Sequence, residues 1–441
     1  MSFISTKFFV LFILFLLCYK LTEKRHNLQK ALVIFGSYLF YCMFDPRYAL
    51  LLFLVSVLNQ IAAHFLYSHK NKMILIVCIG GNVLLLSIFK YIGTLSIYMP
   101  IGLSFYIFEA ISLIVDSYTG KLEKGPSLPD TLLYLSFFPI LISGPIMKAS
   151  EFIPQIKDKH SISLSSFETG IQRFALGAFE KVVIADRLSV AVDAVYSSPA
   201  AYSGLSLLWN SLTYTFQLFF DFTGYTNMAI GIATIIGFNI KENFNLPYIA
   251  SSPSDFWKRW HISLSSWITE YIYIPLGGNR KGMTRTYINI MIAMIISGIW
   301  HGSTLNFLVW GICHGMLQVI EKMAKEKFSF ANFISIPLTF LAINFLWIPF
   351  RTDNLSVTIL VLKRIITNAN GLTYIYSYTL FFGLALVFVE AYALLMNNGN
   401  NPIHPMNLRT FKGKLAFVTL ILLTLMLAYF GNGAFIYGAK F

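Results

Sequence analysis

The chain has 441 residues, of which 56% are hydrophobic and only 12% are charged, and its mean hydropathy is +0.66. Soluble domains carry about a quarter charged residues, and one soluble core stops growing near about 250–300 residues. The composition excludes disordered, collagen-like, coiled-coil and disulfide-rich secreted proteins. It predicts an all-α, polytopic integral membrane protein.

The net charge is +13, from 33 Lys and Arg against 20 Asp and Glu. These basic residues stand at the ends of apolar runs, as in the loops of membrane proteins, instead of clustering on a polar domain. This distribution indicates membrane lipid as the surrounding partner and argues against nucleic acid. No Cys or His spacing suggests a metal site.

A hydrocarbon core about 30 Å thick needs about 20 mostly apolar residues per helix. From the apolar runs we predict about 10–13 membrane-embedded helices, re-entrant or interfacial helices included. The runs cover 5–22, 30–45, 47–67, 72–92, 97–115, 130–147, 170–195, 205–238, 286–300, 304–322, 331–350, 372–396 and 414–435.

The first run and the longest run differ from an ordinary membrane span. The run 5–22 is expected to be a retained span and not a signal peptide, because no small-x-small cleavage motif follows it. The run 205–238 is long for one span and contains Asp221 and Gly224, so a break or tilt is expected there. No linker divides the chain, and we expect one membrane domain over 1–441, comprising N-terminal helices (1–95), a core (96–350) and C-terminal helices (351–441).

The segment 239–285 is too polar to span the bilayer, yet it is rich in aromatic residues. Ser252, followed by Pro253 and Asp255, predicts the start of a helix. At about 100° per residue, one broad face of this helix collects Trp257, Trp260, His261, Leu264, Trp267 and Ile268. An interfacial or re-entrant amphipathic helix is expected, followed by a tight basic turn over 275–282.

Histidine is the side chain most easily poised to exchange a proton near neutrality, and ionisable groups inside a membrane are costly. His301 directly follows the apolar run 286–300, and His261 lies in the polar segment. Either histidine is suited to proton transfer, and either could instead bond a backbone carbonyl; the residues alone leave both interpretations open. For His314, in the next run, packing is the favoured interpretation.

Three longer motifs carry a family resemblance: DFWKRWHISLSSW at 255–267, YIPLGGNR at 273–280 and GIWHG at 298–302. Further similarity lies in FYCMFDP (40–46), GLSFYIFEAIS (102–112), SGP (143–145), KVVIADR (181–187) and DFTGY (221–225). Over roughly residues 35–350 the chain resembles the membrane-bound O-acyltransferase (MBOAT) family. The resemblance is strongest to the bacterial branch that contains the alginate O-acetylation membrane protein.

The resemblance implies acyl transfer to a hydroxyl within a core built around a central channel. It makes His301 the catalytic base, placed in that channel, and His261 a second recurrent histidine. It also implies an acyl-CoA donor, with acetyl-CoA favoured, or an acylated carrier protein, and no tightly bound cofactor. The expected setting is the inner (cytoplasmic) membrane, where members of this branch act with an exported SGNH-type acyltransferase or another polysaccharide-modification protein on an extracytoplasmic polysaccharide.

Several further residues are candidates for substrate binding. Lys258, Arg259, Arg280 and Lys281 are suited to the phosphates of a CoA or carrier-bound donor, or else they anchor the segment at the interface. Asp221 is expected to line the channel, while Glu109, Asp116 and Glu390 are expected to pair with a neighbouring base or amide. The remaining substrate-binding candidates are Asp255, Trp257, Asn279 and Trp300.

Three other functions compete with acetyl transfer. The same superfamily contains D-alanyl transferases, which use a carrier-protein donor and a teichoic-type polymer. A membrane transporter without chemistry of its own, or a scaffold for polysaccharide synthesis, would also fit a polytopic protein. The sequence leaves open whether the polymer is alginate, cellulose, peptidoglycan or a teichoic-type chain.

Overall fold

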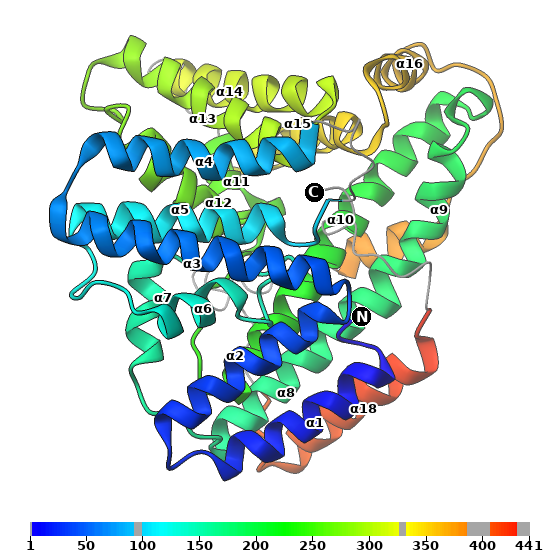
Figure 1. Ribbon diagram of the computed structural model, residues 1–441. Coiled ribbons are helices and arrows are strands. Elements are labelled where there is room, and N and C mark those ends of the chain that lie inside the picture. The colour runs from blue at the N-terminus through cyan, green and yellow to red at the C-terminus, as the bar shows by residue number, and fades with distance from the viewer. Residues whose placement is uncertain (1, 92–98, 326–331, 386–405, 430–441) are drawn as a thin grey trace. The chain divides into compact units, whose positions relative to one another are not determined.

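A computed structural model describes residues 2–91, 99–325, 332–385 and 406–429, and helices are the only regular elements in these ranges (Figure 1). Four of the described helices are long and apolar enough to cross a membrane by length and composition: α3 (Pro46–His69), α4 (Lys72–Tyr91), α13 (Met283–His301) and Ile334–Arg351 within α15. The all-α membrane class is therefore confirmed, and the total of 10–13 membrane-embedded helices stays a prediction.

The chain forms two compact units. One comprises Met1–Ala178 and Tyr225–Lys241, and the other comprises Phe179–Gly224 and Glu242–Lys440. The long helix α10 (Gly204–Ile235) contributes residues to both units. All the sequence-predicted site residues belong to the second unit, which holds His261 and His301.

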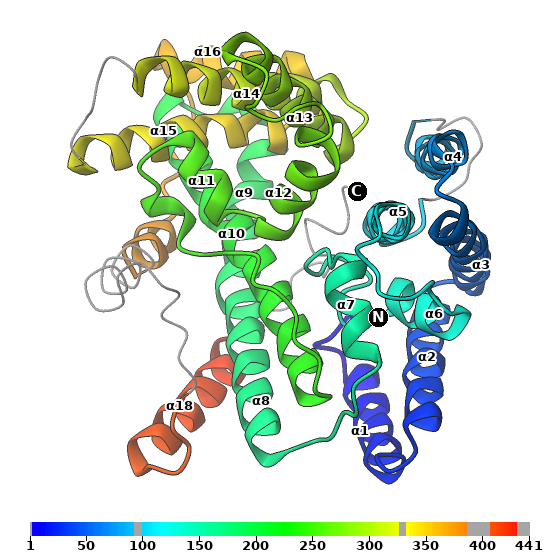
Figure 2. The ribbon, with the colours of Figure 1, turned by 90° about the vertical axis from the view of Figure 1, so that its left-hand side faces the viewer.

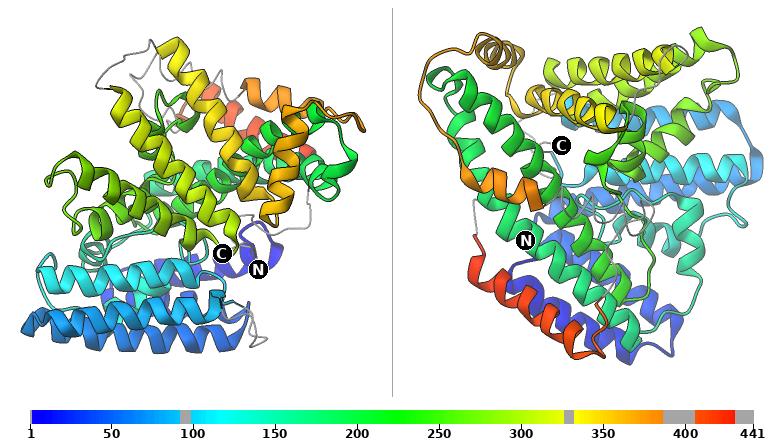
Figure 3. Two further views of the ribbon diagram at one scale, coloured as in Figure 1. Left: turned by 90° about the horizontal axis from the view of Figure 1, so that it is seen from above. Right: turned by 180° about the vertical axis from the view of Figure 1, so that it is seen from behind.

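In the first unit, α3 and α4 pack beside α5 (Leu103–Thr119), as Figures 1 and 3 show. Its acidic groups are paired as predicted: Glu109 accepts from the Met147 amide at 3.4 Å, and Asp116 accepts from the Ser150 amide at 3.0 Å. The other helices of this unit are α1 (Thr6–Leu21), α2 (His26–Cys42), α6 (Leu128–Ser136), α7 (Ala149–Ile156) and α8 (Leu164–Phe179).

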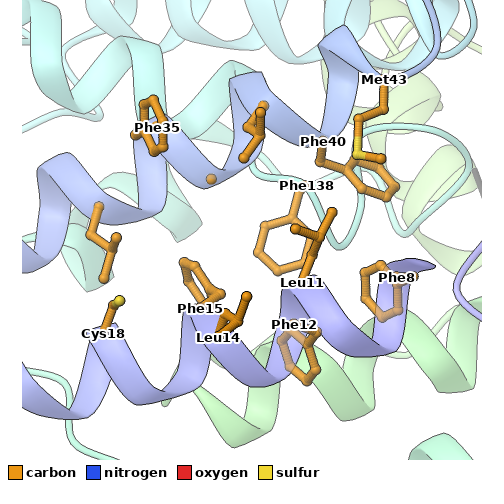
Figure 4. A pocket seen from close by; sticks show the side chains of 13 residues that line it. Phe8, Leu11, Phe12, Leu14, Phe15, Cys18, Phe35, Phe40, Met43 and Phe138 are labelled. Carbon is orange, nitrogen blue, oxygen red and sulfur yellow. The ribbon is translucent and has the colours of Figure 1, made fainter. Parts of the chain in front are cut away.

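An apolar crevice of about 270 Å³ lies between α1 and α2 (Figure 4). Phe8 and Phe12 of α1, Phe35 of α2 and Met43, which caps the end of α2, line it together with Phe138. Lipid tails are as apolar as these side chains, so a surface of this kind is stable in a bilayer.

The second unit contains the site. Near its start a short π-helix, η2 (Glu180–Ala185), leads from α8 into α9 (Asp186–Tyr196). Figure 2 shows α11 (Pro253–Arg259), α13, α14 (Leu305–Lys325) and α15 (Asn332–Arg351) gathered in one part of this unit. Its other elements include α12 (Ile262–Ile268), α16 (Leu355–Ile366), α18 (Phe411–Leu427), the short 3₁₀ helices η3 (Pro199–Ala201) and η4 (Pro247–Ile249), and the short π-helix η5 (Thr269–Tyr273).

The run 130–147 was expected to be one span, and this expectation is wrong. Helix α6 ends at Ser136, and buried turns follow it. Pro139 disfavours helical backbone at Phe138, and the Phe138 amide instead donates to the Ser37 hydroxyl at 3.2 Å. The segment therefore leaves the helix and remains inside the protein.

The predicted break in 205–238 is also absent, since α10 is helical from Gly204 to Ile235. Asp221 does not interrupt the helix because its carboxylate meets the Lys181 ammonium at 2.6 Å. A glycine inside a helix costs only about 1 kcal/mol relative to alanine, so Gly224 is tolerated. Glu390 and residues 386–396 and 430–435 of the last two runs lie outside the described residues.

Candidate active site

The site is built on the close contact between α13 and α14. A Cβ atom added at Gly311 would lie 2.5 Å from the carbonyl oxygen of Met294, and one added at Gly298 would overlap the carbonyl oxygen of Phe307. Small residues of this kind let membrane helices approach backbone to backbone. The contact fixes the end of α13, where His301 is the last helical residue.

Substituting Gly311 should disturb the site by separating these helices. Gly311→Ala is expected to lower the free energy of unfolding by about 1–3 kcal/mol, because overpacking forces backbones apart. The position of His301 should change with it, since His301 is the last residue of α13. Gly80→Ala is the control, because a Cβ atom there meets nothing within 4 Å. Equal thermal unfolding of both variants in detergent would contradict the close contact.

The imidazole of His301 lies in an aromatic cage and is only 1% exposed. Its ring centroid is 4.8 Å from that of Trp300, 5.0 Å from Trp310 and 5.2 Å from Phe350. These side chains come from α13, α14 and α15, so three helices fix the position of the ring.

Helix α11 begins as predicted, with the Ser252 hydroxyl accepting from the Asp255 amide at 3.2 Å and Pro253 at the first helical position. The prediction of one helix through Ile268 is wrong, because α11 ends at Arg259 and α12 starts at Ile262.

The interruption has a tertiary cause. The Asn245 amide donates to the carbonyl of Arg259, and the Ile262 amide donates to the carbonyl of Asn243, both at 2.9 Å. This pairing leaves Trp260 extended and His261 in the left-handed region, with φ of 45°. Backbone strain at a non-glycine residue persists only where the surroundings over-determine it, and it clusters at functional sites.

The structure brings His261 and His301 into one cluster. His261 is fully buried, with its ring centroid 4.8 Å from Phe222 and 6.1 Å from Trp300, the residue that also contacts His301. Burial lowers the pKa of His261 to about 3, so this ring is neutral at physiological pH. Two imidazoles therefore flank one tryptophan, Trp300.

His314, for which packing was favoured, lies beside this cluster. It follows Trp310 by one turn of α14, its ring centroid is 4.5 Å from that of Trp310, and its Nδ1 accepts from the Trp257 indole at 3.2 Å. Trp310, Trp347 and Phe350 are cluster residues that the sequence reasoning missed. The spacing of Trp310 and His314, four residues apart, was the one available signal.

Asp255 and Arg259 take part in local structure. The Asp255 carboxylate pairs with the Arg259 guanidinium at 3.0 Å and accepts from the Ser251 amide at 3.1 Å. Arg259 also donates to the carbonyl of Asn245 at 3.2 Å. The pair therefore holds the start of α11 and its pairing with residues 243–245.

Lys258, Asn279, Arg280 and Lys281 are exposed, in contrast to the buried histidines. The last three belong to the predicted turn, in which Gly277 has φ of 110° and Gly278 has φ of 55°. The charged groups of Lys258, Arg280 and Lys281 therefore face the surroundings of the protein and not the buried histidines.

Asp221 belongs to a buried ion-pair cluster. The Lys181 ammonium lies 2.6 Å from the Asp221 carboxylate and 2.8 Å from that of Asp186, and the Lys181 and Asp221 side chains are 2% and 1% exposed. The structure therefore places Asp221 in contact with a structural cation.

Residues 5–350 match the model of the membrane-bound O-acyltransferase family. A probable alginate O-acetylase from Pseudomonas putida is 35% identical over 387 residues, which cover 81% of this chain and 78% of the relative. A peptidoglycan O-acetyltransferase from Helicobacter pylori is 33% identical over 78% of this chain and 75% of its own length.

A teichoic acid D-alanyltransferase from Bacillus subtilis is 30% identical over 49% of this chain and 58% of its own length. The family model covers well over half of the chain, and it includes the cluster of His261, Trp300 and His301. The chain is therefore a multi-pass membrane enzyme, an O-acyltransferase that belongs to the MBOAT family.

Proposed function

We propose that the protein transfers an acyl group, with acetyl favoured, from a cytoplasmic thioester donor across the membrane for O-acylation of an extracytoplasmic polysaccharide. The observation that supports this most is the buried imidazole of His301, caged by Trp300, Trp310 and Phe350 beside a second buried histidine. The relatives named as O-acetylase and O-acetyltransferase favour acetyl. The proposed setting is the inner membrane.

In the proposed reaction His301 is the general base. It accepts the proton of an acceptor hydroxyl while the hydroxyl oxygen forms a bond to the thioester carbonyl carbon. The π electrons of the carbonyl move onto its oxygen and return to the carbonyl bond as the carbon–sulfur bond breaks. The departing thiolate then takes the proton from His301. The products are an ester and a thiol, and a placed base of this kind contributes about 10²–10⁴-fold to the rate.

Burial of His301 has two consequences for this reaction. A site that excludes water favours transfer to the acceptor over hydrolysis of the thioester. Because the ring is 1% exposed, a hydroxyl can reach it only when a side chain of the cage moves. The central channel implied by the resemblance is part of the proposal, and it would open at this cage.

The exposed cations supply a docking place for the donor. Lys258, Arg280 and Lys281 are suited to the phosphates of CoA or of a carrier-bound phosphopantetheine, since ammonium and guanidinium groups bind phosphate oxygens. Anchoring of the segment at the membrane interface is the competing role. The acceptor in the proposal is the polymer itself or a serine of an exported SGNH-type partner.

Membrane vesicles containing the protein should distinguish acetyl from D-alanyl transfer. With labelled acetyl-CoA, label is expected in the polysaccharide or in an exported partner protein, whereas a D-alanylated carrier protein should transfer none. Vesicles without the protein are the control. Transfer from the alanyl carrier alone would overturn the proposal in favour of D-alanylation, which the Bacillus subtilis relative's name makes the second candidate.

A further inference from the structure

Four buried N–H groups lie together beside His301. They are the indole Nε1 of Trp260, Trp310 and Trp347 and the Nε2 of His314, and all four side chains have no measurable exposure. Within the described ranges of the chain, none of these atoms meets a hydrogen-bond partner. A buried donor left without an acceptor costs about 1–3 kcal/mol, so such groups are rare and call for an explanation.

The four groups form one cluster. Ring centroids are 4.5 Å apart for Trp310 and His314, 6.0 Å for Trp310 and Trp347, and 5.0 Å for Trp260 and Trp347. We call these four residues the donor cluster. The same Trp310 ring lies 5.0 Å from His301, so the donor cluster borders the catalytic base.

The His314 tautomer makes every member a donor. Because Nδ1 of His314 accepts from the Trp257 indole at 3.2 Å, the proton of the neutral ring is on Nε2. An indole nitrogen can only donate. The cluster therefore complements a ligand that presents an oxygen acceptor and brings no donor of its own.

We propose that the donor cluster binds the carbonyl oxygen of the acyl thioester and stabilises the negative charge that develops on it. The inference rests on the proposed function. The acceptor oxygen attacks the carbonyl carbon while His301 takes its proton, and the π electrons of the carbonyl move onto the carbonyl oxygen. There the oxygen accepts hydrogen bonds from the N–H groups of His314 and Trp310. The electron pair returns to the carbonyl bond as the thiolate leaves. Neutral hydrogen-bond donors that are already in position, in a site that excludes water, stabilise a negative charge that develops only in the transition state.

Two substitutions of His314 separate this role from packing. His314→Phe keeps a ring against Trp310 but removes both nitrogens, whereas His314→Gln keeps an amide N–H donor and an acceptor for Trp257. Loss of one oxyanion donor lowers kcat by about 10²–10³-fold, so Phe should show that loss with little change in donor KM. Gln should recover transfer to within about 10-fold of the unsubstituted protein.

A packing role predicts the opposite order, with Phe more active than Gln, and that order would overturn the inference. Unchanged kcat in His314→Phe would do the same, because the cluster would then hold only water. If His314→Phe fails to fold, Trp347→Phe serves instead and should lower kcat at least 10-fold. Its control is Trp209→Phe, since the Trp209 indole already donates to the Tyr376 carbonyl at 3.1 Å.

All variants are assayed in the full-length protein with labelled acetyl-CoA as the probe. If the unsubstituted protein shows no acetyl transfer, the proposed function fails. If the unsubstituted protein is active and His314→Phe is equally active, the proposed function stands and only this inference fails.

Discussion

His301→Gln should abolish O-acylation of the polymer while the protein accumulates in the membrane at its normal level. Glutamine approximates the size of the ring and its hydrogen-bonding atoms, but it cannot accept the acceptor's proton near neutral pH. The loss of a placed base corresponds to about 10²–10⁴-fold in rate. Polymer-bound ester and the amount of membrane protein are measured together, so that a folding defect is separated from a catalytic one.

The matched control is His64→Gln, which replaces an exposed histidine of α3 and should retain full acylation. The competing functions predict different results for His301→Gln. A transporter would still export a preformed acyl product, so the polymer would remain acylated. A scaffold whose function needs His301 would lose the polymer itself. Retained acylation in His301→Gln would reject the catalytic account.

The local signals of the sequence predicted helix starts well and the path of the chain less well. Ser252 and Pro253 mark the start of α11 because capping depends on neighbours in the sequence. The break at Trp260 and His261 depends on hydrogen bonds to residues 243–245, which helical periodicity does not detect. Helical periodicity over 253–268 therefore placed Trp260 and Leu264 correctly on the buried face. It did not predict the break in the helix between them.

The sequence predicted those site residues whose type is unusual in an apolar run. It did not predict those whose type is common throughout the chain. His301 stands out because an ionisable group in an apolar run is costly. Trp347 and Phe350, which complete its surroundings, are aromatic residues in a chain that is 16% aromatic. Nothing in their spacing separates a cage residue from one that faces lipid, so only the packing of α15 identifies them.

Asp221 shows that sequence patterns do not predict contacts between residues far apart along the chain. A carboxylate in an apolar run suggested a channel, because charge inside a membrane usually marks a substrate path. Its partner, Lys181, lies 40 residues earlier, in the π-helix η2. Short π-helical segments within α-helices are frequent at functional sites, and the extra residue changes where the following side chains point. No local pattern joins these two positions.

Lys181→Met should be strongly destabilising. It would leave the carboxylates of Asp221 and Asp186 buried near each other without the cation that they share. Removing one partner of a buried ion pair costs about 3–5 kcal/mol, because a charge remains in a poorly solvated site. Thermal unfolding in detergent and the amount of protein in the membrane should both fall. Lys258→Met, which removes an exposed ammonium, is the control and should unfold like the unsubstituted protein.

Asp221→Asn then decides between the two roles of that carboxylate. It leaves the Lys181 ammonium paired with Asp186 at 2.8 Å, so its unfolding should fall between that of Lys181→Met and that of the unsubstituted protein. If Asp221 acts by pairing, stability and acyl transfer decrease together. Loss of transfer at unchanged unfolding would instead place substrate at Asp221. Unchanged unfolding of Lys181→Met would contradict a stabilising ion pair, because the variant removes a buried cation that contacts two carboxylates.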